Sequence, residues 1–203
     1  MLEQRIQQHF IDSADLKYQA AQALSHPIAA AVQAVLACVT SGGKVLACGN
    51  GPSAAEAQQF AAFCVAGFER ERPELAALAL SSDSTLLTSA AAGAGVASDA
   101  AQQFARQVRA LGQAGDVLLV LSVTGNDANL IAATEAAHER DMTVVVLTGR
   151  TGGKLSVLLR ETDVLISVPH DRAARVREVH ALVLHCLSDG VDAQLLGEQE
   201  IPL

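Results

Sequence analysis

One stretch decides the fold of this chain: Lys44-Val45-Leu46-Ala47-Cys48-Gly49-Asn50-Gly51-Pro52-Ser53-Ala54. Its first five residues form a short apolar run typical of a buried strand, and the glycines that follow permit a tight turn. A helical pattern then covers about Ser53–Phe68. The stretch therefore predicts a strand, a glycine-rich turn and a helix. The start of that helix presents unpaired N–H groups and a positive dipole end, which favour an anion.

The same alternation of strand and helix recurs toward the C-terminus. The further apolar runs are continuous rather than alternating, which is typical of strands that are buried on both faces. We therefore predict a parallel sheet with helices on both faces. The expected strands are Ala76–Leu80, Val117–Leu121, Thr143–Leu147 and Asp163–Val168, and the expected helices are Ala97–Leu111, Ala128–His138 and Ala173–Leu187.

The first forty residues precede any strand and have helical spacing of apolar side chains. His26-Pro27 interrupts this pattern, and a second helix is expected over Ile28–Val39. The pattern predicts a helical hairpin, residues 1–40, as the N-terminal arm of a single domain that spans residues 1–203. Because such an arm has little core of its own, it must pack on the domain or on another subunit.

Composition excludes two classes of function. The chain has 203 residues, of which 50% are hydrophobic, and its formal net charge is −8. That charge argues against direct binding of a nucleic-acid backbone, which needs a basic face. Aromatic residues make up 3% and there is no Trp, which argues against a stacking platform for single strands.

The cysteines and the N-terminus indicate a cytoplasmic protein. Cys38, Cys48, Cys64 and Cys186 form no Cys-x-x-Cys pair and no zinc-site spacing, and each lies in an apolar run. We expect four buried free thiols. The first residues lack the shape of a signal peptide, and no uncharged apolar stretch is typical of a bilayer span. We therefore expect no contact with a membrane.

The turn after the first strand is a candidate anion site. It fits the loose dinucleotide pattern Gly-x-Gly-x-x-Ala, but no Gly-Lys-Ser/Thr follows, so it is not a P-loop. Asp83, after the second expected strand, comes later than the dinucleotide pattern requires, which weakens that interpretation. Gly51 gives the backbone freedom to approach a ligand. Ser53 either caps the helix or donates to a phosphate oxygen.

A second turn with hydroxyl groups follows the third strand. It reads Ser122-Val123-Thr124-Gly125-Asn126-Asp127, and an ordinary capped turn is the alternative interpretation. In an open parallel sheet, ligands bind outside the carboxyl ends of the strands. Two such turns together favour a pocket for a phosphate ester, for which the candidate contacts are Asn50, Gly51, Ser53, Asp83, Ser122, Thr124 and Asn126.

The last helix carries charged and titratable residues, namely Arg175, Arg177, Glu178, His180 and His185. A histidine and a glutamate on one helix could transfer protons. The alternative is that both histidines are partly buried and hydrogen-bonded, with no chemical role.

Several motifs together resemble the SIS (sugar isomerase) domain family. They are Gly49-Asn50-Gly51-x-Ser53-Ala54-Ala55, Ser82-Asp83-Ser84, Ser122-x-Thr124-Gly125-Asn126, Leu147-Thr148-Gly149-x-x-Gly152-Gly153 and Arg175-Val176-Arg177-Glu178-Val179-His180. The chain is similar to the phosphoheptose isomerase branch in particular. The resemblance implies a flavodoxin-like sheet of five parallel strands, a homotetramer and ligand sites near subunit interfaces.

The resemblance also implies roles for single residues. Asn50, Ser53, Ser122 and Thr124 match positions that bind the phosphosugar, and Asp127 replaces a serine. The metal and acid–base positions of the isomerases fall on Gln59, Phe63, Arg177 and His185, where His185 alone matches. Phe63 cannot transfer a proton, and the Arg177 guanidinium would repel a divalent cation. We therefore expect no metal and no other cofactor.

These departures favour a non-catalytic member of the branch. Phe68-Glu69-x-Glu71-Arg72-Pro73 and the stretch Gln107–Leu119 are most similar to the DnaA initiator-associating proteins. The expected function is a tetrameric regulator of replication initiation that binds DnaA, with Leu195 and Leu196 as candidate contacts. One alternative is a sedoheptulose 7-phosphate isomerase that uses His180 or His185 with Glu178. A second alternative is a sensor that binds a sugar phosphate or a nucleotide without chemistry.

Overall fold

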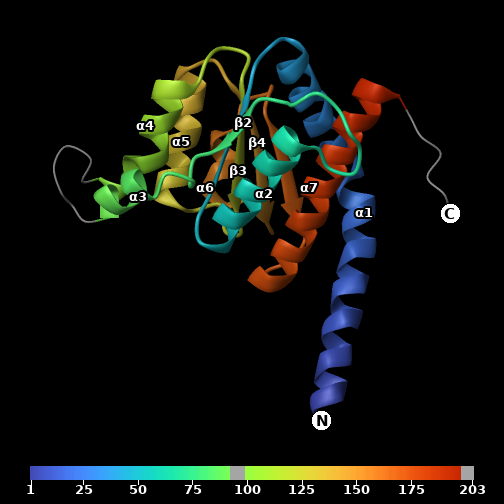
Figure 1. Cartoon of the computed structure of the whole chain (residues 1–203). Coiled ribbons are helices and arrows are strands. Elements are labelled where there is room, and N and C mark those ends of the chain that lie inside the picture. Colours follow the sequence, from blue (N-terminus) through green and yellow to red (C-terminus); the bar gives the residue numbers. More distant parts are fainter. Residues whose placement is uncertain (92–98, 198–203) are drawn as a thin grey trace.

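The computed structural model describes residues 1–91 and 99–197, and it confirms the predicted parallel sheet (Figure 1). The five strands have the order β2-β1-β3-β4-β5, and every neighbouring pair is parallel. Each observed strand overlaps a predicted one. Their bounds are Val45–Gly49 for β1, Ala77–Ala79 for β2, Val117–Ser122 for β3, Thr143–Gly149 for β4 and Val164–Val168 for β5.

Helices cover both faces of the sheet, in two apolar layers. Alternate side chains of β1 enter different layers: Val45 and Ala47 lie in one, with Val35 and Leu184, whereas Leu46 and Cys48 lie in the other, with Phe104 and Leu130. The helices are α1 (Leu2–Thr40), α2 (Pro52–Ala66), α3 (Ser84–Ala91), α4 (Gln103–Leu111), α5 (Ala128–Glu139), α6 (Gly153–Leu158) and α7 (Ala173–Leu196). A 3₁₀ turn, Ala100–Gln102, precedes α4. Residues 97 and 98 of the predicted helix lie outside the described residues.

The strand order places a ligand crevice between β1 and β3. From β1 the chain first moves to β2 on one side, and then returns to β3 on the other. Gly49 is in register with Leu121, so the two strands end at the same level. At such a switch point the connections leave in opposite directions and open a crevice at the carboxyl ends of the strands. Both candidate loops begin there.

The predicted N-terminal hairpin is wrong, because α1 is one continuous helix from Leu2 to Thr40 with Pro27 in its interior. Proline has no N–H and leaves the carbonyl of Ala23 without its helical partner, at a cost of about 3 kcal/mol. Ala23 is exposed, so water can satisfy that carbonyl. Beyond the proline, burial of Ala31 and Val35 against the body of the protein offsets the cost.

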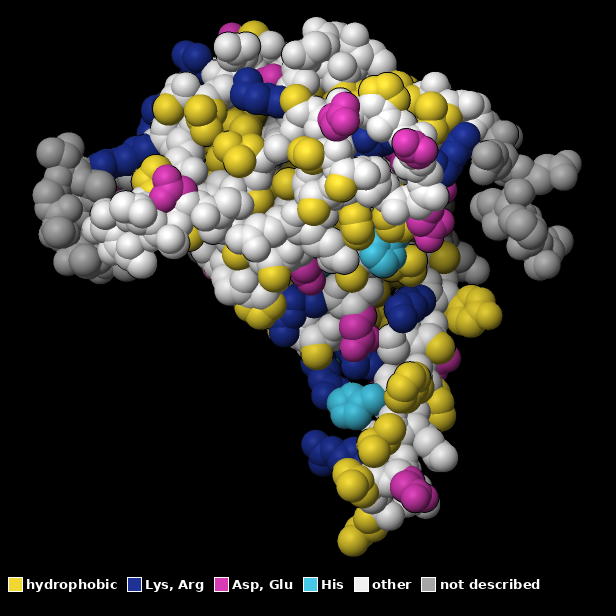
Figure 2. Space-filling model, viewed as in Figure 1, with side chains coloured by type: hydrophobic (Ala, Val, Ile, Leu, Met, Phe, Trp, Pro, Cys, Tyr) yellow, Lys and Arg dark blue, Asp and Glu magenta, His cyan; other side chains and the backbone are white. Residues whose placement is uncertain are grey.

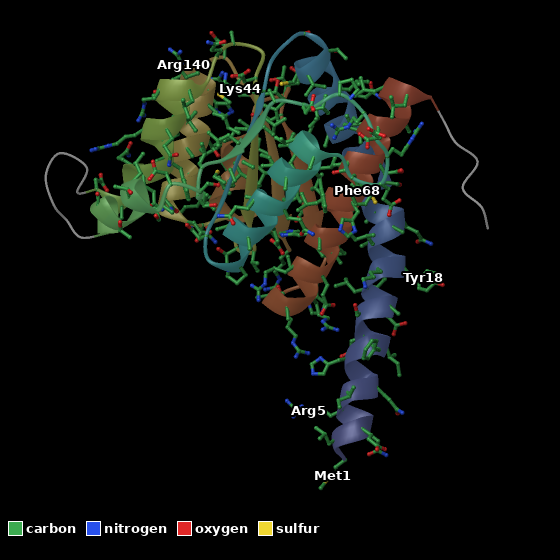
Figure 3. The ribbon with its side chains drawn as sticks, viewed as in Figure 1. Met1, Arg5, Tyr18, Lys44, Phe68 and Arg140 are labelled. Carbon is green, nitrogen blue, oxygen red and sulfur yellow. The ribbon has the colours of Figure 1, made fainter. Side chains whose placement is uncertain are left out.

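The first part of α1 projects from the body with its apolar side chains exposed (Figures 1 and 2). The buried residues of α1 begin at Leu16, and the helix packs against α7 and β5. Before that point Leu2, Ile6 and Phe10 are exposed, and Tyr18 points outward in Figure 3. A stripe of this kind requires a partner surface.

By length and composition alone, α1 is apolar enough to cross a membrane. The expectation that no segment passes this test is therefore wrong. A core helix of a soluble protein and an N-terminal signal sequence pass the same test, so it is weak evidence for a span.

The expected burial of the cysteines holds for three of four. Cys38, Cys48 and Cys64 are buried, and burial raises the pKa of the Cys64 thiol to about 12. Cys186 is exposed, because it lies on the outward side of α7. A thiolate is thus strongly disfavoured at Cys64.

Candidate functional site

The two candidate loops meet at one small cavity, as their places in the sheet require. Asn50 follows β1, Ser122 ends β3, and Thr124 lies two residues farther on. Together with Ser53, these side chains line a cavity of about 170 Å³, which Asp127 and Arg177 complete. Three amide or hydroxyl donors from two loops, and one from the first turn of α2, converge on this space.

Ser53 does not cap α2. The N-cap residue is Gly51, whose φ of 54° is a left-handed conformation that glycine adopts without strain. Pro52 takes the first helical position, where its missing N–H costs nothing. Ser53 is consequently the second residue of the helix, 4% exposed, and faces the cavity.

The Asp127 carboxylate accepts hydrogen bonds from donors of the cavity instead of capping α5. It is the N-cap residue, but its side chain makes no capping hydrogen bond. The Ser122 hydroxyl donates to Asp127 Oδ2, and Asn50 Nδ2 donates to Oδ1 at 3.2 Å. Asn50 and Asn129 also exchange two amide hydrogen bonds of 2.9 Å. The capped-turn interpretation of this loop is therefore wrong for Asp127, whose carboxylate lies where an anionic ligand would be held.

Glu56, one helical turn after Ser53, carries an acid that the sequence analysis missed. Its side chain is 13% exposed, and its Oε2 has no hydrogen-bond partner among the described residues. Burial raises the pKa of Glu56 to about 6, although a hydrogen bond with Ser53 and the charge of Arg177 oppose the rise. One sequence signal could have indicated Glu56: it is a lone acid in the apolar stretch of the helix that follows the first loop.

His180 faces Glu56 from α7. It is fully buried, and its Nδ1 lies 4.0 Å from Glu56 Oε2. Its Nε2 lies 3.1 Å from the Thr148 carbonyl oxygen, which can only accept, so the proton sits on Nε2. Burial lowers the pKa of His180 to about 4, and Arg177 adds to that effect. The neutral ring therefore presents the Nδ1 lone pair to Glu56, and this nitrogen has no partner within the described part of the chain.

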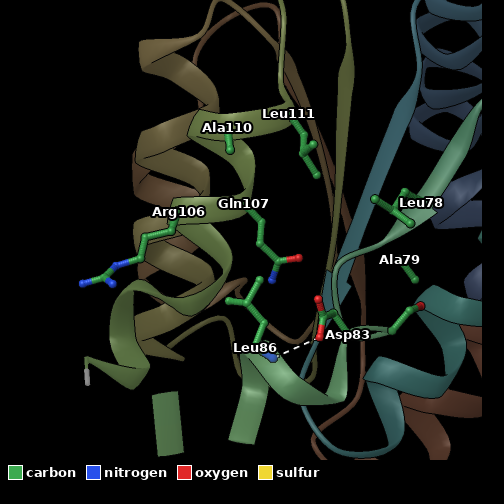
Figure 4. Close-up of a pocket in the computed structure, with 9 residues that line it drawn as sticks. Leu78, Ala79, Asp83, Leu86, Arg106, Gln107, Ala110 and Leu111 are labelled. Carbon is green, nitrogen blue, oxygen red and sulfur yellow. Dashed lines mark hydrogen bonds between the residues drawn. The ribbon is translucent and has the colours of Figure 1, made fainter. Parts of the chain in front are cut away.

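Three other predicted contacts lie apart from this cavity. The Asn126 amide donates to Thr124 O and accepts from Lys154 N, so it ties the β3 loop to the start of α6. Gly51 contributes backbone at the start of α2. Asp83 accepts from Leu86 N at 3.0 Å and lines a different hollow, between β2 and α4 (Figure 4).

The remaining candidates on α7 are engaged elsewhere. Glu178 pairs with Arg175, which also donates to the carbonyl of His9 in α1. His185 stacks on Phe68, with ring centroids 5.2 Å apart. Leu195 and Leu196 are 36% and 40% exposed at the end of α7, remote from the loops in sequence.

The positions that hold a metal in the resembled isomerases do not fit one here. Phe63 packs edge-on against Phe68 and contacts His185 at a centroid distance of 5.7 Å. Gln59 is exposed on α2, and Arg177 contributes a permanent positive charge. Within residues 1–91 and 99–197, no three His, Cys, Asp or Glu residues gather as metal ligands. One imidazole and one amide are too few for a zinc site.

Comparison with known proteins identifies the family. A family model described as "SIS domain" matches residues 8–149. The chain belongs to the SIS domain family. Two curated relatives, each named phosphoheptose isomerase, come from Methylibium petroleiphilum and Azoarcus sp. The first is 62% identical and covers 99% of this chain and 98% of its own, and the second is 53% identical with 97% and 98% covered.

Solved structures of SIS members support the same branch. Phosphoheptose isomerase GmhA from Neisseria gonorrhoeae has a TM-score of 0.88 and 46% identity, and covers 95% of this chain and 100% of its own. A phosphoheptose isomerase from Francisella tularensis has a TM-score of 0.89 and 39% identity, with 95% and 98% covered. The flavodoxin-like fold and the phosphoheptose isomerase branch are confirmed.

The expected non-catalytic function is contradicted by these relatives. High-identity matches along nearly the whole chain are named as isomerases, and none of these four is named as a DnaA-binding regulator. Neither the DnaA partner nor a role in replication initiation is supported. Identity to isomerases along 97–99% of the chain outweighs the substitutions at residues 59 and 63.

Proposed function

We propose that this chain binds a phosphosugar in the cavity between β1 and β3, and interconverts the aldose and ketose forms of a heptose phosphate. One observation carries this proposal: donors from two loops and α2 converge on the cavity, beside the guanidinium of Arg177 and the carboxylate of Asp127. These donors are Asn50, Ser53, Ser122 and Thr124. The names of the relatives supply the substrate class.

In this proposal the phosphate lies at the N-terminus of α2. The hydroxyls of Ser53, Ser122 and Thr124 donate to its oxygens, and Asn50 completes the set. The positive end of the α2 dipole adds a favourable field for the phosphate, although the N–H groups of Ser53 and Ala54 already donate to the carbonyls of Asn50 and Gly51. Asp127 accepts from two of these donors, so its carboxylate must turn away when phosphate enters.

A second candidate function is favoured by one observation. Phe63 and Gln59 stand where the resembled isomerases have acid–base residues, so a site that binds the phosphosugar without turnover is the alternative. Binding and turnover are separate measurements, and the two functions differ only in the second.

We expect sedoheptulose 7-phosphate to raise the melting temperature of the protein and to be converted to its aldose isomer. Ser122→Ala removes a donor to the charged phosphate, a loss of about 1.5–3 kcal/mol, so affinity falls roughly 10- to 150-fold. Thermal-shift titration measures the affinity, and a discontinuous assay of the aldose measures turnover.

The exposed Ser41, at the end of α1, provides the matched control: Ser41→Ala keeps wild-type affinity. A thermal shift without turnover would favour the binding function over the isomerase. A flat thermal response to phosphosugars would contradict both.

We propose further that the exposed arm packs against other copies of the chain in a homotetramer, and that the protein is cytoplasmic. The support is the stripe of Leu2, Ile6 and Phe10 at four-residue spacing, which leaves one face of α1 apolar and uncovered. Coverage by identical arms would bury that face without another protein.

Light scattering on a size-exclusion column is expected to give four times the chain mass. Phe10→Asp places a charge in the stripe and is expected to lower the measured mass, while the circular dichroism stays helical. Gln4→Asp adds the same charge at an exposed polar position of the arm, and should leave the mass unchanged. A monomeric wild type at micromolar concentration would contradict the assembly.

A further inference from the structure

Glu56 and His180 do not line the cavity themselves, but both lie next to residues that do: Ser53 is hydrogen-bonded to Glu56, and the charge of Arg177 acts on both side chains. Glu56 Oε2 and His180 Nδ1 face one another at 4.0 Å, and both lack hydrogen bonds among the described residues. With Glu56 ionised, two acceptors oppose each other. With Glu56 protonated, its O–H can donate to Nδ1 after a small approach. The geometry therefore favours a carboxyl group that accepts a proton and holds it.

Arg177 supplies positive charge at the same place. Its side chain lines the cavity, and its charge acts on both Glu56 and His180. A guanidinium stays protonated at every relevant pH and presents several donors in a fixed plane. Charge that develops on a substrate oxygen beside it is stabilised without a metal ion.

We propose that Glu56 is the catalytic base of the isomerisation and that Arg177 replaces the positive charge of a metal. In this proposal Nδ1 of His180 accepts a hydrogen bond from the protonated carboxyl group of Glu56. The proposal rests on the proposed function, because it names the residues that perform that reaction. It explains how a chain with Phe63 and Gln59 at the usual positions could still carry out the chemistry.

The step balances without any co-reactant. The Glu56 carboxylate removes the proton from C2 of the aldose, and the C–H electron pair forms a C1–C2 double bond while O1 gains negative charge. Arg177 stabilises that oxygen. The proton of the O2 hydroxyl passes to O1, a carbonyl forms at C2, and the carboxyl group of Glu56 returns its proton to C1. Substrate and product are isomers, and the enzyme ends in its initial state.

Other acids and bases on α7 are less suited to this role. Arg175 holds Oε1 of Glu178, although Oε2 of Glu178, like that of Glu56, has no hydrogen-bond partner among the described residues, and His185 is stacked among aromatic rings. Glu56 combines partial exposure, an unpartnered oxygen and a position one turn from Ser53. Burial raises its pKa to about 6, so it is mostly ionised at pH 7 and still basic enough to act.

The test is the turnover of Glu56→Gln with sedoheptulose 7-phosphate. We expect kcat to fall at least 100-fold, because general-base catalysis contributes about 10²–10⁴-fold. The phosphosugar-induced rise in melting temperature should persist. Glu135→Gln makes the same change on the exposed face of α5 and should retain wild-type turnover. Near-wild-type turnover of Glu56→Gln would overturn the proposal while leaving the isomerase function intact.

Two further readouts separate chemistry from structure. Wild-type turnover after dialysis against a chelator is expected to persist, and a loss that zinc restores would overturn the proposal. The plot of kcat/KM against pH should rise through about pH 6 and then level, since Ser53, Arg177 and His180 face the titrating carboxyl group. His180→Phe removes the acceptor of the held proton and should move that rise to lower pH. Absence of turnover in the wild type would refute the isomerase function itself, and this proposal with it.

Discussion

Arg72→Ala is expected to lower the free energy of unfolding by about 3–5 kcal/mol, the usual effect of removing one partner of a buried ion pair. Arg72 Nε lies 2.5 Å from Asp192 Oδ1, and both side chains are 2% exposed. The guanidinium also donates to the carbonyls of Cys64 and Phe63, at 2.7 and 2.8 Å. The variant would therefore leave a buried carboxylate and the last turn of α2 without their partner.

Urea unfolding at one fixed protein concentration measures this loss, because the proposed assembly would make stability depend on concentration. The control is Arg109→Ala. Arg109 pairs with Glu139 at 2.7 Å, but the two side chains are 42% and 54% exposed. An exposed pair contributes about 0–1 kcal/mol. Equal losses in the two variants would contradict the argument from burial.

Gly125→Ala is expected to abolish phosphosugar binding, because it forces the β3 loop out of place. Gly125 has φ of 68°, and a Cβ there would lie 1.8 Å from the carbonyl oxygen of Gly152. That carbonyl belongs to the turn before α6. The β3 loop and this turn are in contact, so relieving the clash requires one of the two segments to shift. Ser122 and Thr124 would leave the cavity, and the thermal shift caused by the ligand should disappear.

Gly42→Ala isolates the cost of the backbone conformation. Gly42 has a similar φ of 78°, but a Cβ added there would meet no other atom within 4 Å. It should lose about 1–2 kcal/mol of stability, the cost of the left-handed conformation, and bind the phosphosugar normally. Loss of binding in this control, or normal binding by Gly125→Ala, would show that the tight contact with Gly152 is not what shapes the loop.

The sheet could be predicted because its signals are local. Each buried strand is a continuous apolar run, and glycine or hydroxyl residues mark where it ends, as at Gly49 and Ser122. Parallel order follows from the helices between the runs. The helices α3 and α6 were missed because runs of eight and six residues give too few turns for a helical period to show.

The arm and the cavity depend on tertiary contacts that a pattern does not contain. Pro27 has a strong local tendency to end a helix, yet the packing of Ala31 and Val35 on the body overrides it. Asp127 is a residue type typical of a helix N-cap and stands at the N-cap position. Its side chain is instead hydrogen-bonded in the cavity by Ser122 and by Asn50, which lies in the loop after β1. The pairing of Glu56 with His180 joins residues far apart in sequence, and only the crossing of α2 over α7 brings them together.

The packing of α1 on α7 has a consequence for how the chain is made. The first helix leaves the ribosome early, yet the surface that buries Leu16, Leu24 and Val35 is provided by elements near the other end of the sequence. Until the chain beyond Ala173 has been synthesised, an apolar helix remains without its native neighbour. Contacts of such long sequence separation slow folding and prolong exposure to aggregation. The native packing of α1 is therefore completed only after α7 has been synthesised.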